Sequence, residues 1–97
     1  MATFEQHCED CERTLGHRYE EVNCWLDELQ EDYGPRHRVF RHHTQGVEMV
    51  HAKWGKEAGK AAEIHIRRDC NGKLLTPDEF RNYYGIRTED ITTEDVD

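Results

Sequence analysis

Helical spacing of the apolar side chains, interrupted by glycine and proline, is the feature that most constrains the fold of this chain. Apolar residues recur every three or four positions in three stretches, which end at Gly16, at Tyr33-Gly34-Pro35 and at Gly55. Glycine readily adopts the left-handed conformation that closes a helix, and proline cannot continue one. The pattern predicts helices over about residues 3–15, 19–33 and 38–54.

The next part of the chain gives a less uniform pattern. Residues 55–62 contain two glycines and are predicted to form a loop. In the following segment Ile64 and Ile66 alternate as in a strand, whereas His65 and Asp69 are four positions apart, as on one face of a helix. We favour the helix, with a short strand at residues 62–68 as the alternative.

A final helix is predicted from the sequence TPDEF, which begins at Thr76. Threonine at the N-cap, Pro77 at the first helical position and Glu79 two positions later form a capping box. Residues 87–97 are polar and acidic and are expected to form a flexible tail. The sequence therefore predicts an all-α fold, a compact single domain of four or five helices over residues 1–86.

The hydrophobic core of such a domain must be small. Only 35% of the 97 residues are apolar and 35% are charged, and a chain of this length is near the lower limit for one self-sufficient core. Small domains of this kind often need a metal ion, a disulfide, a ligand or a second copy of the chain for stability.

Charge is distributed unevenly along the chain. The net charge is −8, with −8 in residues 1–34, +5 in residues 35–73 and −5 in residues 74–97. An acidic protein should repel duplex nucleic acid, but its basic centre could hold a small anion. A solvated helix surface with scattered charge explains the same pattern equally well.

The cysteines and the absence of a long apolar run indicate a soluble protein of the cytoplasm. No stretch approaches the roughly 20 apolar residues that cross a bilayer, and the first residues lack a signal-peptide core. Thiols or metal ligands are therefore expected rather than disulfides. Cys8 and Cys11 form one half of a zinc motif, but Cys24 and Cys70 supply no second half. Small core residues are the favoured interpretation.

Histidines on the apolar faces of the predicted helices are candidate metal ligands. His43 lies at the centre of the apolar stripe of residues 38–54, and His7 lies on the apolar face of the first helix. His65 and Asp69 could meet them from a third helix. Mixed histidine and carboxylate ligation suits zinc, manganese or iron, with zinc favoured. The predicted metal ligands are His7, His43, His65 and Asp69. Core histidines bonded to backbone or tyrosine hydroxyls are the alternative.

Arginines give a different candidate site. Guanidinium groups favour bidentate capture of phosphate or carboxylate, and His42 is predicted to point away from the apolar stripe on the same helix. An anionic ligand, a nucleotide above all, is the partner that such a patch would bind. The candidate residues are Arg36, Arg38, Arg41, His42, Arg67 and Arg68. Ion pairs with the many acidic residues are the alternative.

Enzymatic motifs are weak in this sequence. It contains no glycine-rich phosphate loop, no nucleophile elbow and no H-E-x-x-H motif. The function predicted from the residues is a non-enzymatic protein that binds a divalent metal in its interior. A protein that sequesters an anionic nucleotide is the second hypothesis, and a metal-dependent hydrolase is the third.

The segments RHRVFRHHTQG, EIHIRRDCNGK and TPDEF together resemble a family of small uncharacterised bacterial and phage proteins. Those proteins have an R-H-R…R-H-H…G block followed by E-x-H…D-x-G, and similarity extends over about residues 5–80, including Trp25 and Asp27. The resemblance implies a helical fold and no established activity. This chain differs from those proteins at Asn23, where others tend to place a histidine. The cluster that it implies consists of His7, His37, His42, His43, His65 and Asp69.

A phage origin would have consequences for the nucleotide hypothesis. It would place the protein in the cytoplasm of an infected host cell and would make counter-defence a plausible role, including capture of a host signalling nucleotide. This inference is an analogy with the resembled family rather than a conclusion from the residues.

Overall fold

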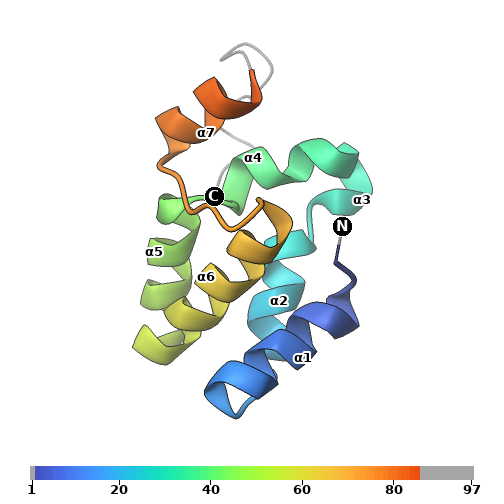
Figure 1. Ribbon diagram of the computed structural model, residues 1–97, viewed down its shortest axis with the longest axis vertical. Coiled ribbons are helices and arrows are strands. Elements are labelled where there is room, and N and C mark those ends of the chain that lie inside the picture. The colour runs from blue at the N-terminus through green and yellow to red at the C-terminus, as the bar shows by residue number, and fades with distance from the viewer. Residues whose placement is uncertain (1, 86–97) are drawn as a thin grey trace.

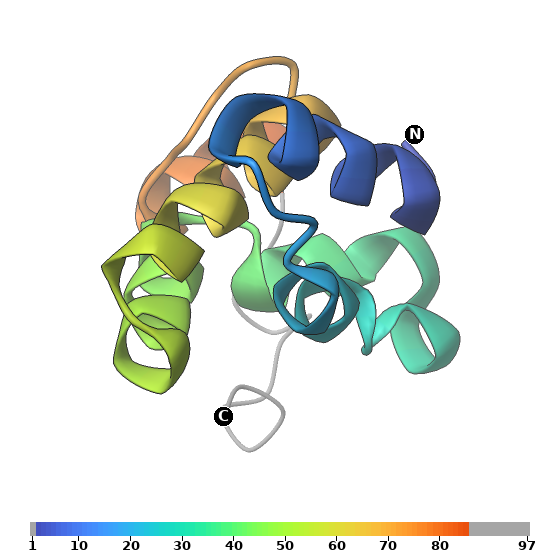
Figure 2. The ribbon, with the colours of Figure 1, turned by 90° about the horizontal axis from the view of Figure 1, so that it is seen from below.

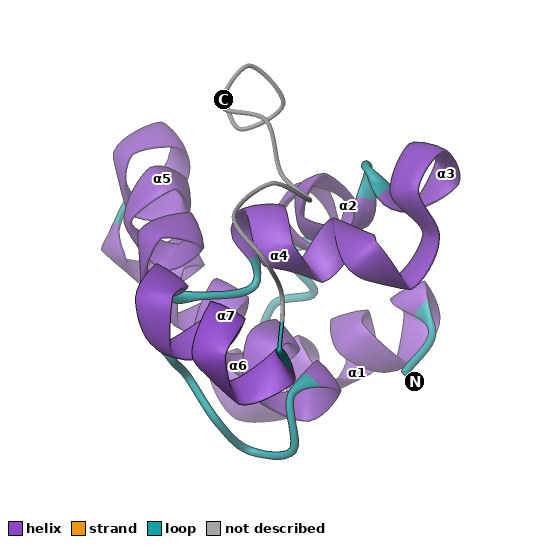
Figure 3. Cartoon of the chain, turned by 90° about the horizontal axis from the view of Figure 1, so that it is seen from above, coloured by secondary structure: helices purple, strands orange, loops and turns teal. Residues whose placement is uncertain are grey.

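The computed structural model describes residues 2–85, apart from the side chains of residues 35 and 36, and this part of the chain contains helices and no strands (Figure 3). The fold is the predicted small all-α domain. Residues 87–97, the predicted tail, lie outside the described residues. The elements are α1 (Phe4–Leu15), α2 (Glu20–Asp27), α3 (Gln30–Tyr33), the 3-10 helix η1 (Gly34–His37), α4 (Arg38–Arg41), α5 (Thr44–Trp54), α6 (Lys56–Asp69) and α7 (Pro77–Tyr84).

The first and last helices begin with capping boxes. Thr3 accepts a hydrogen bond from the backbone N–H of Gln6, whose side chain bonds back to the Thr3 backbone. Thr76 and Glu79 make the same pair of bonds at the start of α7, as predicted. Each pair satisfies two backbone N–H groups that a helix start would otherwise leave without partners. Gly16 ends α1 in the left-handed conformation, with φ of 80°.

The predicted third helix, residues 38–54, is wrong, because the chain bends at His42 and His43. His42 has φ −89° and ψ 52°, and His43 is extended, so α4 and α5 are separate helices. Gly46 makes this bend compatible with close packing: a Cβ atom there would lie 1.8 Å from the carbonyl oxygen of Arg41. The predicted second helix is likewise divided into α2 and α3.

The predicted loop at residues 55–62 is also wrong, because α6 begins at Lys56. Gly55 alone joins α5 to α6, with φ of 99°, which favours glycine. A Cβ atom added at Gly59 would lie 3.1 Å from Cδ2 of His51. Helices α5 and α6 therefore approach each other closely at Gly59, and this glycine allows them to pack together. Residues 62–68 are helical, as favoured, and the strand alternative is excluded.

Helix α6 is the centre of the fold. It packs against α5 on one side and against α1 and α2 on the other (Figures 1 and 2). Helix α4 contacts both α2 and α7. The largest core side chains are Trp25, Leu26, Phe40, Ile66 and Phe80. In addition to this apolar core, α6 buries polar side chains, which are described below.

None of the helices within residues 2–85 is both long enough and apolar enough to cross a bilayer.

Candidate metal centre

Four histidines and two aspartates meet between α1, α2, α4 and α6. Their side chains come from α1, α2, η1 and α6 and from the residue after α4, so the site depends on the tertiary fold. All four histidines are buried, and the Asp69 side chain is 1% exposed. We call these residues the His/Asp cluster: His7 in α1, Asp27 in α2, His37 in η1, His42 after α4, and His65 and Asp69 in α6.

Asp69 is one centre of this cluster. Its Oδ2 atom lies 3.2 Å from Nε2 of His7, 3.3 Å from Nε2 of His42 and 3.4 Å from Nε2 of His65. His65 and Asp69 are four residues apart on α6 and so share one helix face, as the sequence predicts. Three imidazole rings from separate parts of the chain thus place the same ring nitrogen within 3.4 Å of one carboxylate oxygen.

Asp27 is the second centre. Its Oδ1 atom lies 3.0 Å from Nε2 of His37, 3.3 Å from Nε2 of His65 and 3.5 Å from Nε2 of His42. His42 and His65 therefore contact both carboxylates. The potential ligand atoms form two overlapping groups, each within 4.8 Å: His7, Asp27, His65 and Asp69, and Asp27, His37 and His42.

The spacing of these atoms fits a metal ion, and without one the His42–Asp69 and His65–Asp27 contacts, each at 3.3 Å, are long hydrogen bonds. Zinc binds imidazole nitrogen and carboxylate oxygen at about 2.0–2.2 Å, which separates tetrahedral ligand atoms by roughly 3.3 Å. The nitrogen–oxygen distances of 3.2–3.5 Å at Asp69 and at the His42 and His65 contacts with Asp27 match this separation. Charged hydrogen bonds are usually shorter, about 2.7–2.9 Å.

The ring orientation of His65 makes its Nε2 atom a potential ligand. The amide nitrogen of Asn23 donates to the carbonyls of Arg18 and Tyr19, so Asn23 Oδ1 faces His65 and accepts from Nδ1 at 2.8 Å. An amide oxygen cannot donate, and Nδ1 must therefore carry the proton. In the neutral ring the Nε2 lone pair then points at Asp27 and Asp69, which is unfavourable without a cation between them.

His37 has the same arrangement. Its Nδ1 atom lies 2.7 Å from the carbonyl oxygen of Gly34 and must donate to it, while Nε2 lies 3.0 Å from Asp27. Histidines that bind metals commonly donate their second ring nitrogen to a carbonyl or carboxylate in this way. Two of the four imidazoles are thus held in the tautomer that metal binding requires.

Several buried polar atoms of the cluster lack hydrogen-bond partners among the described residues. Neither ring nitrogen of His7 has one, because Nε2 is near Asp69 but poorly aligned with it. Nδ1 of His42 and Oδ1 of Asp69 are also without partners. Buried polar atoms are normally satisfied, so these atoms indicate that a further group belongs in the site.

The pKa values of four side chains in the cluster are shifted from their usual range. Burial raises the pKa of both aspartates, but hydrogen bonds with the surrounding histidines outweigh burial and hold the pKa of Asp27 and Asp69 well below the usual range. Burial lowers the pKa of His42 to about 4. Burial also acts to lower the pKa of His65, but its bonds to the two aspartates raise it overall. The carboxylates therefore remain charged and attract a cation, either a proton or a metal.

His43, a predicted metal ligand, lies outside the cluster. Its Nε2 atom donates to the carbonyl of Val39, and its Nδ1 atom accepts from the N–H of Gly46 as the N-cap of α5. Both ring nitrogens are used, and no lone pair remains for a metal. The bend between α4 and α5 turns His42 into the cluster, so its predicted outward orientation is wrong, whereas His43 is buried as predicted but lies outside the cluster.

The structure brings together three of the four predicted metal ligands, His7, His65 and Asp69. Sequence reasoning from periodicity missed Asp27, His37 and His42, although the family resemblance included both histidines. Asn23 and Asp27 are four residues apart on α2, the same spacing as His65 and Asp69, and this repeated pattern was the available signal for Asp27.

The predicted arginine patch is dispersed. Arg41 is buried over the Trp25 ring and donates to the Trp25 carbonyl at 2.6 Å. Arg67 bonds the carbonyl of Gly72 on the surface. Arg68 bonds Asp10 through both carboxylate oxygens. The side chain of Arg36 lies outside the described part of the structure, and Arg38 and Arg68 line a pocket considered below.

The cysteines do not form a metal site in the described residues. Cys8, Cys11 and Cys70 are buried, and burial raises the pKa of all three thiols. The amide of Asn23 contacts the sulfur atoms of Cys8 and Cys11. These thiols pack as small core residues, whereas Cys24 is exposed.

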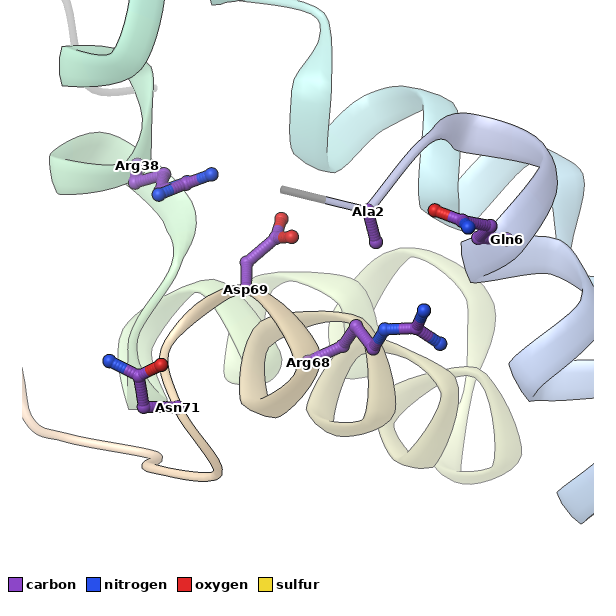
Figure 4. A pocket seen from close by; sticks show the side chains of 6 residues that line it. All are labelled: Ala2, Gln6, Arg38, Arg68, Asp69 and Asn71. Carbon is purple, nitrogen blue, oxygen red and sulfur yellow. The ribbon is translucent and has the colours of Figure 1, made fainter.

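Two surface pockets border the cluster. One, of about 440 Å³, is lined by Ala2, Gln6, Arg38, Arg68, Asp69 and Asn71 (Figure 4). The other, of about 380 Å³, is lined by Phe4, Cys24, Asp27, Glu28, Gln30 and Glu31. The second pocket is acidic and reaches Asp27, whose side chain is 21% exposed, so it offers a cation a path to the cluster.

Comparison of the chain with protein-family models, with curated proteins and with solved structures gives no match.

Proposed function

We propose that this protein binds a divalent transition-metal ion in the His/Asp cluster. The observation that carries the proposal is the convergence of buried imidazole Nε2 atoms on two carboxylates at metal-ligand spacing. The ligands are His7, Asp27, His65 and Asp69. His37 and His42 contact the Asp27 carboxylate beside them. This composition of nitrogen and oxygen ligands suits zinc, manganese or iron(II), and zinc is our first candidate.

Charge balance supports a divalent ion. Asp69 is buried and Asp27 is partly buried, and their two negative charges are costly there unless a cation compensates them. One divalent cation neutralises both carboxylates. It also supplies a partner for one of the two unpaired ring nitrogens of His7 and for the Nε2 atom of His65, which Asn23 directs inward.

The role of the ion is stabilisation of the fold. The cluster joins α1, α2, the segment from η1 to α4, and α6, and these elements share only a small apolar core. Metal binding that occurs only in the folded state adds directly to the free energy of unfolding. A free ion concentration 100 times the dissociation constant adds about 2.7 kcal/mol.

Thermal melting of chelator-treated protein tests the proposal. Zinc, manganese and iron(II) are added separately, with magnesium as a control because it prefers oxygen ligands. At the concentration considered above, the preferred ion should raise the melting temperature by roughly 10–20 °C. Elemental analysis of protein purified without added metal should find at least one ion per chain.

Matched variants on α6 locate the site. Asp69→Asn removes a ligand and should abolish most of the metal-dependent rise. Glu63→Gln changes an acidic residue on the same helix that pairs with Arg67 outside the cluster, and it should leave the rise unchanged. A melting temperature that no transition metal alters, or equal behaviour of the two variants, would contradict the proposal.

A further inference from the structure

The pocket that borders Asp69 has features that the metal site alone does not require. It is open to the surface, has a volume of about 440 Å³, and places two arginines and two side-chain amides around a carboxylate of the cluster (Figure 4). Pockets of roughly 300–1,000 Å³ accommodate small molecules. We call this surface the arginine pocket: Ala2, Gln6, Arg38, Arg68, Asp69 and Asn71.

Arg38 is the side chain that most clearly lacks a partner in the arginine pocket. Its Nε atom is buried and has no hydrogen-bond partner among the described residues. The guanidinium also has no ion pair in that part of the chain, whereas Arg41 and Arg68 pair with Glu28 and Asp10. In Figure 4 its guanidinium lies beside the Asp69 carboxylate and points into the pocket. A half-buried guanidinium without an anion is a preformed binding group for one.

The charge around the pocket depends on the metal. Arg13, Arg38 and Arg68 contribute three positive charges, and Asp10, Asp27 and Asp69 contribute three negative ones, so these six side chains carry no net charge. A divalent ion in the cluster changes this sum to +2. The loaded pocket should therefore attract an anion more strongly than the metal-free pocket.

We infer that the arginine pocket binds a phosphate group, and that it does so when the adjacent His/Asp cluster holds its metal. Arg38 supplies the bidentate N–H donors that match phosphate oxygens, and Gln6 and Asn71 contribute amides at the pocket wall. The ligand is inorganic phosphate or a small phosphate ester. This inference rests on the proposed metal site and names the class of ligand that would bind beside it.

The inference differs from the nucleotide patch predicted from the sequence. That patch also included Arg41 and Arg67, and neither lines the pocket. No aromatic side chain of the described residues lines the pocket to stack on a base. The structure therefore supports recognition of the phosphate itself.

Titration calorimetry with inorganic phosphate tests the inference. The sample is protein loaded with the ion that gives the largest rise in melting temperature and then freed of excess metal. Phosphate should bind the loaded protein, and Arg38→Gln should weaken its affinity by about 10-fold or more, as expected for a lost charged hydrogen bond. Arg67→Gln is the matched control because Arg67 bonds Gly72 and Glu63 outside the pocket.

The outcomes separate this inference from the proposed function. A metal-dependent rise in melting temperature without phosphate binding, or with equal affinities for the two variants, overturns the inference and leaves the metal site intact. Equal phosphate affinity in metal-free protein overturns the dependence on the cluster. Failure of all ions to stabilise the protein removes the basis of both. A nucleoside monophosphate that binds tighter than phosphate identifies an ester as the ligand, and weaker binding identifies free phosphate.

Discussion

Two buried histidines, His65 and His43, should respond in opposite ways to metal when each is replaced with alanine. Both rings are almost inaccessible to solvent, and each uses Nδ1 and Nε2 in contacts with other residues. Only His65 directs a ring nitrogen at the carboxylates of the cluster. The comparison therefore separates metal binding from ordinary burial of a histidine.

His43→Ala should destabilise the protein equally with and without metal. The change removes the N-cap of α5, which costs about 1 kcal/mol, and leaves the buried carbonyl of Val39 without a donor, which costs about 1–3 kcal/mol. The free energy of unfolding should fall by roughly 2–4 kcal/mol in both states. His43→Asn should recover most of the cap, since asparagine is a preferred N-cap residue.

His65→Ala should instead remove most of the metal-dependent stability. If the wild-type protein gains about 2.7 kcal/mol at a metal concentration 100 times its dissociation constant, a 100-fold weaker site gains only about 0.4 kcal/mol at the same concentration. Urea denaturation with and without metal measures both increments. Retention of the full increment by His65→Ala, or its loss in His43→Ala, would refute the assignment of the site.

Three further predictions concern the bend, the protonation of the cluster and the thiols. Gly46→Ala should cost at least about 3 kcal/mol or prevent folding, since its Cβ would overlap the Arg41 carbonyl oxygen. Gly59→Ala should cost much less, because the nearest atom there belongs to the His51 side chain. Thermal melts followed by circular dichroism compare the two variants. In metal-free protein, the unfolded chain takes up a proton at His42 near pH 6.5, whereas the folded chain does so near its lowered pKa of about 4. The stability contributed by His42 is therefore complete above about pH 6.5 and is lost as the pH falls to about 4. The loss is roughly 1.4 kcal/mol per pH unit. In His42→Gln, the free energy of unfolding measured in urea should vary less with pH over that range. Thiol labelling of the native protein should be fast only at Cys24, because the other three thiols are buried with raised pKa values.

Local signals explain which helices could be predicted from the sequence. The capping box at Thr76 and the glycine after α1 are encoded within a few residues, and the structure confirms both predictions. The predicted loop at residues 55–62 is wrong because it treats glycine as a helix breaker. In the tertiary fold, Gly59 is helical and allows α6 to lie against His51. Packing between helices overrides intrinsic propensity there.

The errors at the candidate site have one physical origin. A helical-wheel argument carries its phase forward at about 100° per residue only while the helix is continuous. The bend at His42 resets that phase, and the extended backbone of His43 makes it an N-cap. His65 and Asp69 were predictable together because both lie on one unbroken helix. Asp27 and His37 join them only through tertiary packing, which periodicity within a single segment cannot reveal.

Anomalous X-ray diffraction from metal-loaded crystals, recorded above the absorption edge of the bound ion, tests the metal site most directly. We predict a peak between α1, α2 and α6, about 2.0–2.2 Å from Nε2 of His7 and His65 and from carboxylate oxygens of Asp27 and Asp69. A peak only at exposed residues such as Cys24 or His17, or no peak from fully loaded crystals, would contradict it.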